Sequence, residues 1–137
     1  MDMDCLFCKI ANKEIPAKIV YEDDSGLAFL DIMPRSPGHT VVIPKQHAAT
    51  LVELTDSGIA PLFAAVKRVD EILTEKLNPD GVTIGINQGK ANGQEVGHLH
   101  IHLMPRSHND GGHAVQSVVD SGKSTPLDEI AKKLGIS

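Results

Sequence analysis

Three histidines alternate with apolar residues in one short stretch of the chain. His98, His100 and His102 occupy every second position of GHLHIHLMPR, residues 97–106. On a β-strand successive side chains point to opposite faces, so the three imidazoles would share one face and the apolar residues the other. A helix would leave only His98 and His102 near each other. The alternation therefore predicts a strand carrying a row of imidazoles, with same-face neighbours ~6.6 Å apart.

A row of imidazoles can do several kinds of chemistry. Imidazole titrates near neutrality, so it can accept protons, donate hydrogen bonds to anionic oxygens, attack an electrophile or bind a metal ion. Idle surface positions are normally filled by Lys, Glu or Thr, which disfavours a row of unused histidines. The outer pair would lie ~13 Å apart along a strand, which disfavours one tetrahedral metal bound by all three. We therefore interpret the row as residues that divide their tasks.

Other elements must position this row. Runs of β-forming residues bounded by turn residues predict four more strands, over residues 18–23, 26–31, 39–45 and 81–88. A short helix is expected over residues 5–14. A long helix is indicated by apolar residues at steps of three and four: Ile59, Leu62, Phe63, Val66, Val69, Leu73 and Leu77. Together these elements predict a mixed α and β fold. His39 lies at the start of the third predicted strand, and Asn78-Pro79 is expected to end the long helix.

Composition limits the classes of partner. The chain has 137 residues, which fits one compact core, and a formal charge of -5 without a basic run. That charge disfavours a nucleic-acid duplex as partner. No apolar stretch approaches the ~20 residues of a membrane span, and the acidic start MDMDCLFC lacks a signal-peptide pattern. We therefore expect no membrane partner and a cytoplasmic location.

The chain changes character after Arg106. Residues 107–124 are polar and contain several glycines, and Thr125 followed by Pro126 is typical of a helix start. We expect residues 1–106 to form the domain that carries the histidine row. Residues 107–137 are expected to form a C-terminal arm with a short helix.

The only two cysteines form a Cys5-x-x-Cys8 motif with three interpretations. A redox pair would need a thioredoxin-like βαβ context, which the pattern does not predict. Two incidental buried thiols are the second interpretation. A zinc site is the third, and it requires two more ligands from elsewhere in the chain.

The histidine row resembles the signature of a known family. HLHIHLM is similar to the His-φ-His-φ-His-φ-φ pattern of the histidine triad (HIT) superfamily, where φ is apolar. The resemblance covers most of residues 5–106, through LFCKIANKEIPAKIVYEDD, LAFLDIMPRSPGHTVVIPKQH and GINQGKANGQEVGHLHIH, and is strongest to the branch of the nucleoside phosphoramidate hydrolases. It implies an α+β fold: a five-stranded antiparallel sheet with one long helix and a short N-terminal helix. It also implies a homodimer in which the sheet continues across both protomers.

The resemblance also implies catalytic roles. His100 would attack the α-phosphorus of a nucleotide and form a nucleotidyl-histidine intermediate that water hydrolyses. Its other ring nitrogen would donate to the backbone carbonyl of His98, His102 would contact the phosphate and the leaving group, and His39 would support the row. Imidazole suits this chemistry, because a neutral nucleophile approaches a phosphorus with negative oxygens more readily than hydroxide does.

Further positions match the family's purine nucleotide site. Asp31 corresponds to a carboxylate that binds the ribose hydroxyls, and Asn87 and Gln94 to residues that bind the phosphate, beside amides near Gly93. Glu95 stands where the eukaryotic phosphoramidate hydrolases have serine, which puts assistance to the leaving group from that position in doubt. The apolar walls around the base correspond to Leu6, Phe7, Ile10, Phe29 and Ile32.

The resemblance adds ligands to the cysteine motif. In zinc-bearing members of the superfamily, the pair is completed by residues that correspond to His47 and His98. The implied site is a structural zinc bound by Cys5, Cys8, His47 and His98, and no cofactor is needed for the chemistry.

These inferences lead to one preferred function and two alternatives. The preferred function is hydrolysis at the α-phosphate of purine nucleoside phosphoramidates or related adenylylated compounds. The alternatives are a dinucleoside polyphosphate hydrolase and a nucleotide-binding interaction module. The family's transferases usually have glutamine in place of the last histidine, so His102 favours hydrolysis. The C-terminal arm, with His108 and His113, is expected either to tune substrate choice, as in related dimers, or to be a surface appendage.

Overall fold

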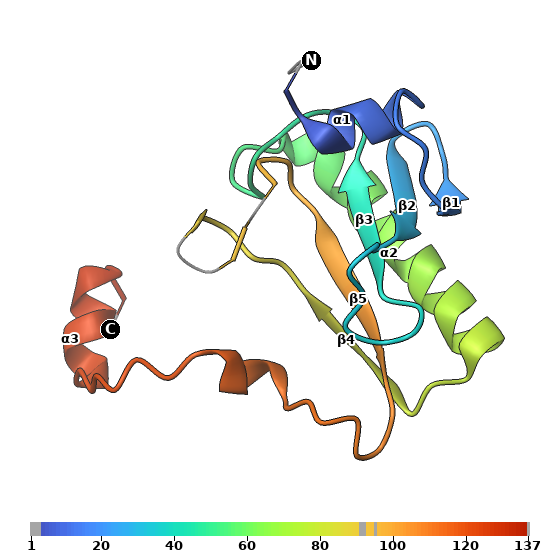
Figure 1. The fold of residues 1–137 in the computed structure, drawn as a ribbon. Helices are drawn as coiled ribbons and strands as arrows, with labels where there is room; N and C mark the ends of the chain where they lie inside the picture. Colours follow the sequence, from blue (N-terminus) through green and yellow to red (C-terminus); the bar gives the residue numbers. More distant parts are fainter. Residues whose placement is uncertain (1–3, 91–92, 95, 137) are drawn as a thin grey trace.

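Five strands form one antiparallel sheet in the order β1-β2-β3-β5-β4 (Figure 1). The computed structural model describes residues 4–90, 93–94 and 96–136. The strands are β1 (Ile19–Glu22), β2 (Gly26–Leu30), β3 (Thr40–Pro44), β4 (Gly81–Gly85) and β5 (Ile101–Arg106). The expected α+β fold with a five-stranded antiparallel sheet is confirmed, and each strand is shorter than predicted.

The long helix α2 (Asp56–Leu77) packs on one face of this sheet. Leu99, Ile101 and Leu103 are buried in a cluster with its apolar residues, so the apolar half of the predicted alternation faces α2. Asn78 ends the helix in the left-handed conformation, as Asn-Pro predicts. Phe63 and Leu77 were expected in the packed face but are 42% and 50% exposed, because they lie at its border.

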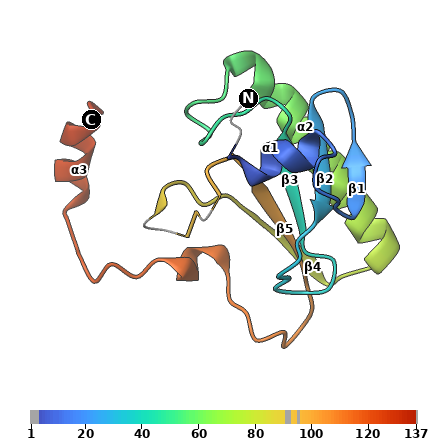
Figure 2. The same cartoon turned by 45° about the horizontal axis from the view of Figure 1, so that its top comes forward.

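The short helix α1 (Leu6–Ala11) lies against the opposite face of β2 and β3 (Figure 2). Phe7 and Ile10 are buried there among apolar residues of the two strands. The Cys5 sulfur accepts a hydrogen bond from the Cys8 amide at 3.2 Å and so caps the helix. The predicted range of 5–14 was too long, because Lys13 adopts a positive φ of 64° that a helix does not tolerate.

Strand β5 begins four residues later than the start predicted at residue 97. The Leu99 amide donates to the Ala48 carbonyl, in the loop after β3, at 2.7 Å, so this segment is held by the loop rather than by a strand. Pairing with β3 begins only at Ile101, opposite Val42. His98 and His100 therefore precede the strand, yet their side chains remain on the face away from α2.

A glycine turn delivers His39 to the start of β3. Gly38 has a φ of +91°, and a Cβ there would lie 2.4 Å from Leu77 Cδ1. Only glycine fits both the conformation and the space. The turn thereby fixes His39 next to β5 at the face that carries the histidine row.

The chain leaves the sheet after β5 and forms the C-terminal arm. It includes a 3-10 helix (Val115–Val118) and the helix α3 (Leu127–Lys133), which lies apart from the sheet in both views (Figures 1 and 2). The N-cap of α3 is Pro126, one residue later than predicted, because Pro126 is extended with ψ 139°. None of the helices in the described ranges combines the length and apolar character that a membrane span needs.

Candidate active site

His39 and His102 form a hydrogen-bonded pair at the centre of the histidine face. The Arg35 backbone amide donates to His39 Nδ1 at 3.1 Å, and His39 Nε2 lies 2.9 Å from His102 Nδ1. An amide can only donate, so neutral His39 carries its proton on Nε2 and donates it to His102 Nδ1. Neutral His102 then carries its own proton on Nε2. The pairing thus makes His102 Nε2 a hydrogen-bond donor.

The surroundings keep both rings neutral. Burial, followed by the nearby His100 and His39, lowers the pKa of His102 from its ordinary value of 6.5 to about 4. Burial also lowers the pKa of His39, against the opposing effect of Asp31, whose Oδ2 lies 3.6 Å from His39 Nε2. At neutral pH the donor on His102 is therefore an uncharged imidazole.

The low pKa of His102 predicts a loss of stability in weak acid. In the unfolded chain this ring takes up its proton near pH 6.5, whereas in the folded protein it does so only near pH 4. Between these values the unfolded state binds more protons, so the free energy of unfolding falls as pH falls. We measure the free energy of unfolding with urea at pH 6.5 and at pH 4. Between these values it is expected to fall by about 1–2 kcal/mol less in His102→Gln than in the wild type, after allowance for partial solvent screening.

A matched exposed histidine provides the control for this measurement. The side chain of His108 is 87% exposed, so His108→Gln is expected to keep the wild-type slope of stability against pH. Other titrating groups are common to all three proteins and cancel in the comparison. Equal slopes for His102→Gln and the wild type would contradict the prediction.

His100 has one ring nitrogen engaged and one available for bonding. Its Nδ1 donates to the His98 carbonyl at 2.7 Å, which leaves Nε2 without the proton in the neutral ring. The ring is 8% exposed, and its centroid lies 5.0 Å from that of His102 and 5.1 Å from that of Phe7. The His100 ring is thus held in a fixed orientation, with its Nε2 available for bonding beside a hydrogen-bond donor.

The structure buries some of the residues expected around the nucleoside together and leaves others exposed. Phe7 and Phe29 are buried with ring centroids 5.4 Å apart, and Ile10 is buried beside them. Asp31 is at the end of β2, and its Oδ1 accepts from the Met33 amide at 2.8 Å. Leu6 is 43% exposed at the surface of α1, and Ile32 is 94% exposed. Ile32 does not form a buried wall in this structure.

The glycine-rich loop before β5 is organised by Gln94. Its Nε2 donates to the Ala49 carbonyl at 2.6 Å, and its Oε1 accepts from the Gly89 amide at 2.7 Å. Both ends of the side chain are therefore engaged with backbone. Gly93, with a φ of +93°, supplies the left-handed turn that the loop requires. Glu95 lies outside the described residues.

Two cysteines and two histidines meet on the same side of the sheet as the row. His98 Nδ1 lies 3.3 Å from Cys5 Sγ, 3.4 Å from Cys8 Sγ and 3.2 Å from His47 Nδ1, and Cys8 Sγ lies 3.2 Å from His47 Nδ1. All four ligand atoms lie within 4.8 Å of one another.

These four donors fit a tetrahedral metal ion. In a zinc site with such ligands, neighbouring donor atoms lie ~3.3–3.8 Å apart, close to the separations seen here. His98 Nε2 donates to the Pro44 carbonyl at 2.8 Å, so the nitrogen facing the cysteines is the unprotonated one that a metal needs. Asp31, His39 and His102 also bring donor atoms within 4.8 Å of one another, but there the facing nitrogens already form a hydrogen bond.

A cavity of about 630 Å³ opens beside His102. Its walls come from three parts of the chain: the loop before His39, the strands β4 and β5 with the segment after β4, and the start of the C-terminal arm. Asn87 and His102 line it together, so the structure brings these two predicted residues to one hollow. The arm contributes three valines to the lining: Val115, Val118 and Val119.

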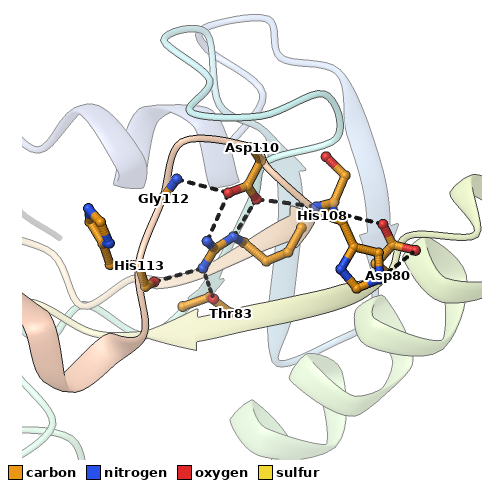
Figure 3. Close-up of polar contacts among 8 residues, drawn as sticks. Asp80, Thr83, His108, Asp110, Gly112 and His113 are labelled. Carbon is orange, nitrogen blue, oxygen red and sulfur yellow. Dashed lines mark hydrogen bonds and ion pairs between the residues drawn. The ribbon is translucent and has the colours of Figure 1, made fainter.

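Arg106 fastens the start of the arm to the sheet. Its partners Thr83 on β4 and Asp110 and His113 in the arm are labelled in Figure 3. Its guanidinium donates to both carboxylate oxygens of Asp110, at 2.6 and 3.0 Å, and through Nη1 to Thr83 Oγ1 and the His113 carbonyl. Arg106 holds the pKa of the Asp110 carboxyl well below its usual range. Asp110 also accepts from the amides of Ser107 and Gly112, which closes the loop into a fixed wall of the cavity.

The fold and the site define a class of protein: a small α+β domain that presents a row of imidazoles beside a Cys/His cluster. The HIT domain family model matches residues 12–109. The chain therefore belongs to the histidine triad (HIT) family, as its signature predicted.

Individual relatives agree with this assignment. An uncharacterised HIT-like protein of Methanocaldococcus jannaschii is 47% identical over 95% of this chain and 98% of its own length. The adenosine 5'-monophosphoramidase of Schizosaccharomyces pombe is 40% identical over 80% of each chain. The solved structure of a Zn-bound histidine triad family protein of Mycobacterium smegmatis superposes with a TM-score of 0.74 at 41% identity, over 79% of this chain and 78% of its own.

Several contributors to the site were not identified from the sequence. Arg35 and Ser36 lie in the loop MPRSPG before His39, where no sequence pattern indicates a site residue. The Arg106–Asp110 pair was also missed, although a spacing of four residues between opposite charges is a visible signal. The carbonyl of Pro44, which orients His98, carries no side-chain signal at all.

Proposed function

We propose that the protein hydrolyses purine nucleoside phosphoramidates or related adenylylated compounds at the α-phosphate, through a nucleotidyl intermediate on His100. The observation that carries this proposal is the hydrogen bond from His100 Nδ1 to the His98 carbonyl, because it leaves Nε2 with a free electron pair. The similarity to an adenosine 5'-monophosphoramidase adds support at the level of the family.

The reaction divides into two steps. In the first, His100 Nε2 forms a bond to the α-phosphorus, and the bond from phosphorus to the leaving nitrogen breaks with its electron pair. The leaving nitrogen takes a proton from solvent. In the second step a water oxygen bonds to phosphorus, its protons pass to solvent, and the electrons of the N–P bond return to His100. His102 Nε2 donates to a phosphoryl oxygen in both steps and stabilises its negative charge.

The nucleoside would occupy the side of the row nearest α1. Asp31 accepts from the ribose hydroxyls, and Phe7, Ile10, Phe29 and the surface residues Leu6 and Ile32 contact the base. The phosphate would lie near Asn87 and the loop of Gly93 and Gln94, whose own amides donate to the Lys90 and Gly89 carbonyls at 3.3 Å before substrate binds. Apolar contacts of this kind select flat rings without strong preference, so adenine and guanine compounds should both be substrates.

The proposal includes a structural zinc and a homodimer. Cys5, Cys8, His47 and His98 would hold the ion, which when bound cross-links α1 to the segment before β5. The zinc-bound relative supports this choice of metal. Strand β4 forms one edge of the sheet, so its outer side is available to continue the sheet into a second protomer. A cytoplasmic location stays a prediction.

A substrate panel tests the proposed function. The panel contains AMP and GMP phosphoramidates, diadenosine polyphosphates and adenylyl sulfate. We expect kcat/KM for the phosphoramidates to exceed that for the polyphosphates by about a hundredfold or more, because their leaving groups need different contacts. Preference for the polyphosphates would support the dinucleoside polyphosphate hydrolase instead. Tight nucleotide binding without hydrolysis of any member would support an interaction module.

A further inference from the structure

One arginine that lines the cavity beside His102 has no carboxylate partner among the lining residues. Three of the lining residues have fixed charges: Arg35, Arg106 and Asp110. Arg106 and Asp110 neutralise each other through two hydrogen bonds. His102 is neutral at pH 7, since its pKa is about 4. The charge that remains on the cavity wall is that of the Arg35 guanidinium.

Arg35 is held close to the reacting groups by its backbone. Its amide donates to His39 Nδ1, and the other nitrogen of that ring donates to His102, so only one imidazole ring separates the Arg35 backbone from His102. Burial is the main cause that lowers the pKa of His39, Asp31 opposes it, and the positive charge of Arg35 adds to the lowering. No side-chain partner of the Arg35 guanidinium occurs among the described residues.

The neighbouring residue adds a second unused polar group. Ser36 lines the same cavity, and its buried hydroxyl oxygen has no hydrogen-bond partner within the described part of the chain. A buried hydroxyl without a partner is unfavourable unless another group supplies the hydrogen bond. The opposite wall is apolar, with Val115, Val118 and Val119 of the arm. The cavity thus has a cationic residue, Arg35, on one side and apolar contact on the other.

We propose that Arg35 binds an anionic group on the leaving portion of the substrate and so selects nucleotidyl compounds whose leaving group is both anionic and apolar. The inference builds on the proposed hydrolysis and names its substrate class. His102 faces the leaving-group side of the row, so the part of the substrate released from phosphorus extends into this cavity. A guanidinium binds the paired oxygens of a carboxylate, sulfate or phosphate through parallel N–H groups.

Matched substrates isolate this interaction. One compound is adenosine 5'-phosphoramidate N-linked to leucine, which presents a carboxylate and an apolar side chain. The other carries leucinamide, which has the same shape without the charge. The ratio of kcat/KM between the two compounds is measured for each protein, so that the intrinsic difference in leaving ability cancels when proteins are compared.

The test variant is Arg35→Gln. We expect it to lower kcat/KM for the leucine compound about tenfold and to leave the leucinamide compound within about twofold. Arg35→Lys should retain part of the preference, because it keeps the charge but not the planar fork. Arg68→Gln is the matched control, since it removes an exposed arginine from α2 on the opposite face of the sheet. An equal loss for both compounds, or no loss for either, would overturn the proposal.

A binding measurement separates this proposal from the proposed hydrolysis. In a His100→Ala background, calorimetry with the same two compounds reports affinity without turnover. We expect the leucine compound to bind about tenfold tighter than the leucinamide compound, and Arg35→Gln to remove that difference. If the wild type hydrolyses neither compound but this difference is present, the proposed hydrolysis fails and the role of Arg35 holds. If the affinities are equal, the role of Arg35 fails.

Discussion

Replacement of His100 by alanine is expected to lower kcat for AMP phosphoramidate by about ten-thousandfold or more. The physical reason is the loss of the only ring whose free nitrogen is fixed by a hydrogen bond from its other nitrogen to the His98 carbonyl. Water would have to attack the phosphorus directly, against the charge of its oxygens. Nucleotide affinity should change by less than about fivefold, because the contacts proposed for the ribose and base remain.

Steady-state kinetics and mass spectrometry check this result together. Rapid quenching of the wild-type reaction should trap a nucleotidyl adduct on the peptide that contains His100, and the variant should form none. His108→Ala is the control, because its ring is 87% exposed and its Nε2 lies 3.8 Å from an Asp80 carboxylate oxygen, in the arm rather than in the histidine row. An active His100→Ala protein, or an adduct on another histidine, would show that the chemistry proceeds by a different route.

Loss of the metal cluster is expected to have the second large effect, on stability. Cys8→Ser removes a proposed zinc ligand, the Cys8 sulfur, which lies 3.2 Å from His47 Nδ1 and 3.4 Å from His98 Nδ1. Without the ion, α1 and the segment before β5 are joined only by apolar packing and weak hydrogen bonds. We expect the variant to retain little zinc and its Tm to fall by about 10 °C or more, which corresponds to about 3 kcal/mol for a domain of this size.

A chelator distinguishes loss of metal from a simple packing defect. Removal of the ion from the wild type should lower its Tm to near that of Cys8→Ser, whereas the same treatment should leave the variant unchanged. Zinc should restore the wild type alone. Two results would contradict a structural zinc. One is a metal content below ~0.2 zinc per chain in protein purified without chelators, and the other is a wild type that keeps its Tm after a chelator has removed all of its metal.

The Cys/His cluster and the histidine row share one residue, His98. The His98 ring faces the cysteines, and its backbone carbonyl accepts from His100 Nδ1. Movement of His98 would therefore alter the orientation of the His100 ring. Loss of the ion is therefore expected to lower kcat as well as the stability of the fold.

Local patterns in the sequence were sufficient to predict the main helices and strands. In the segment where histidine alternates with apolar residues, they also predicted the face of the sheet that each side chain takes. The alternation of histidine with Leu99, Ile101 and Leu103 reports which side of an extended segment each residue takes, and this depends only on backbone geometry. The steps of three and four in α2 and the Asn78-Pro79 stop are equally local. The resemblance to the histidine triad family added the ligand set and the catalytic roles that no local pattern could supply.

The tertiary structure decided which residues meet. Cys5 reaches His98 across 93 positions, and His39 reaches His102 across 63, because the fold places α1 and the start of β3 beside the same strand. Neither of these two contacts is indicated by a periodic pattern of residues in the sequence. The later start of β5 also follows from a distant partner, since Ala48 takes the Leu99 amide that a longer strand would have used.

The sequence by itself determined the chemistry available to this protein: imidazoles in a row, a pair of thiols and a set of strands and helices to carry them. Only the tertiary structure decided that Arg35 faces the same cavity as His102, that Gln94 is engaged with backbone, and that Arg106 fixes the arm as a wall. The reason is physical. Side-chain direction follows from local backbone geometry, whereas the path of a loop follows from the packing and hydrogen bonds of the whole chain.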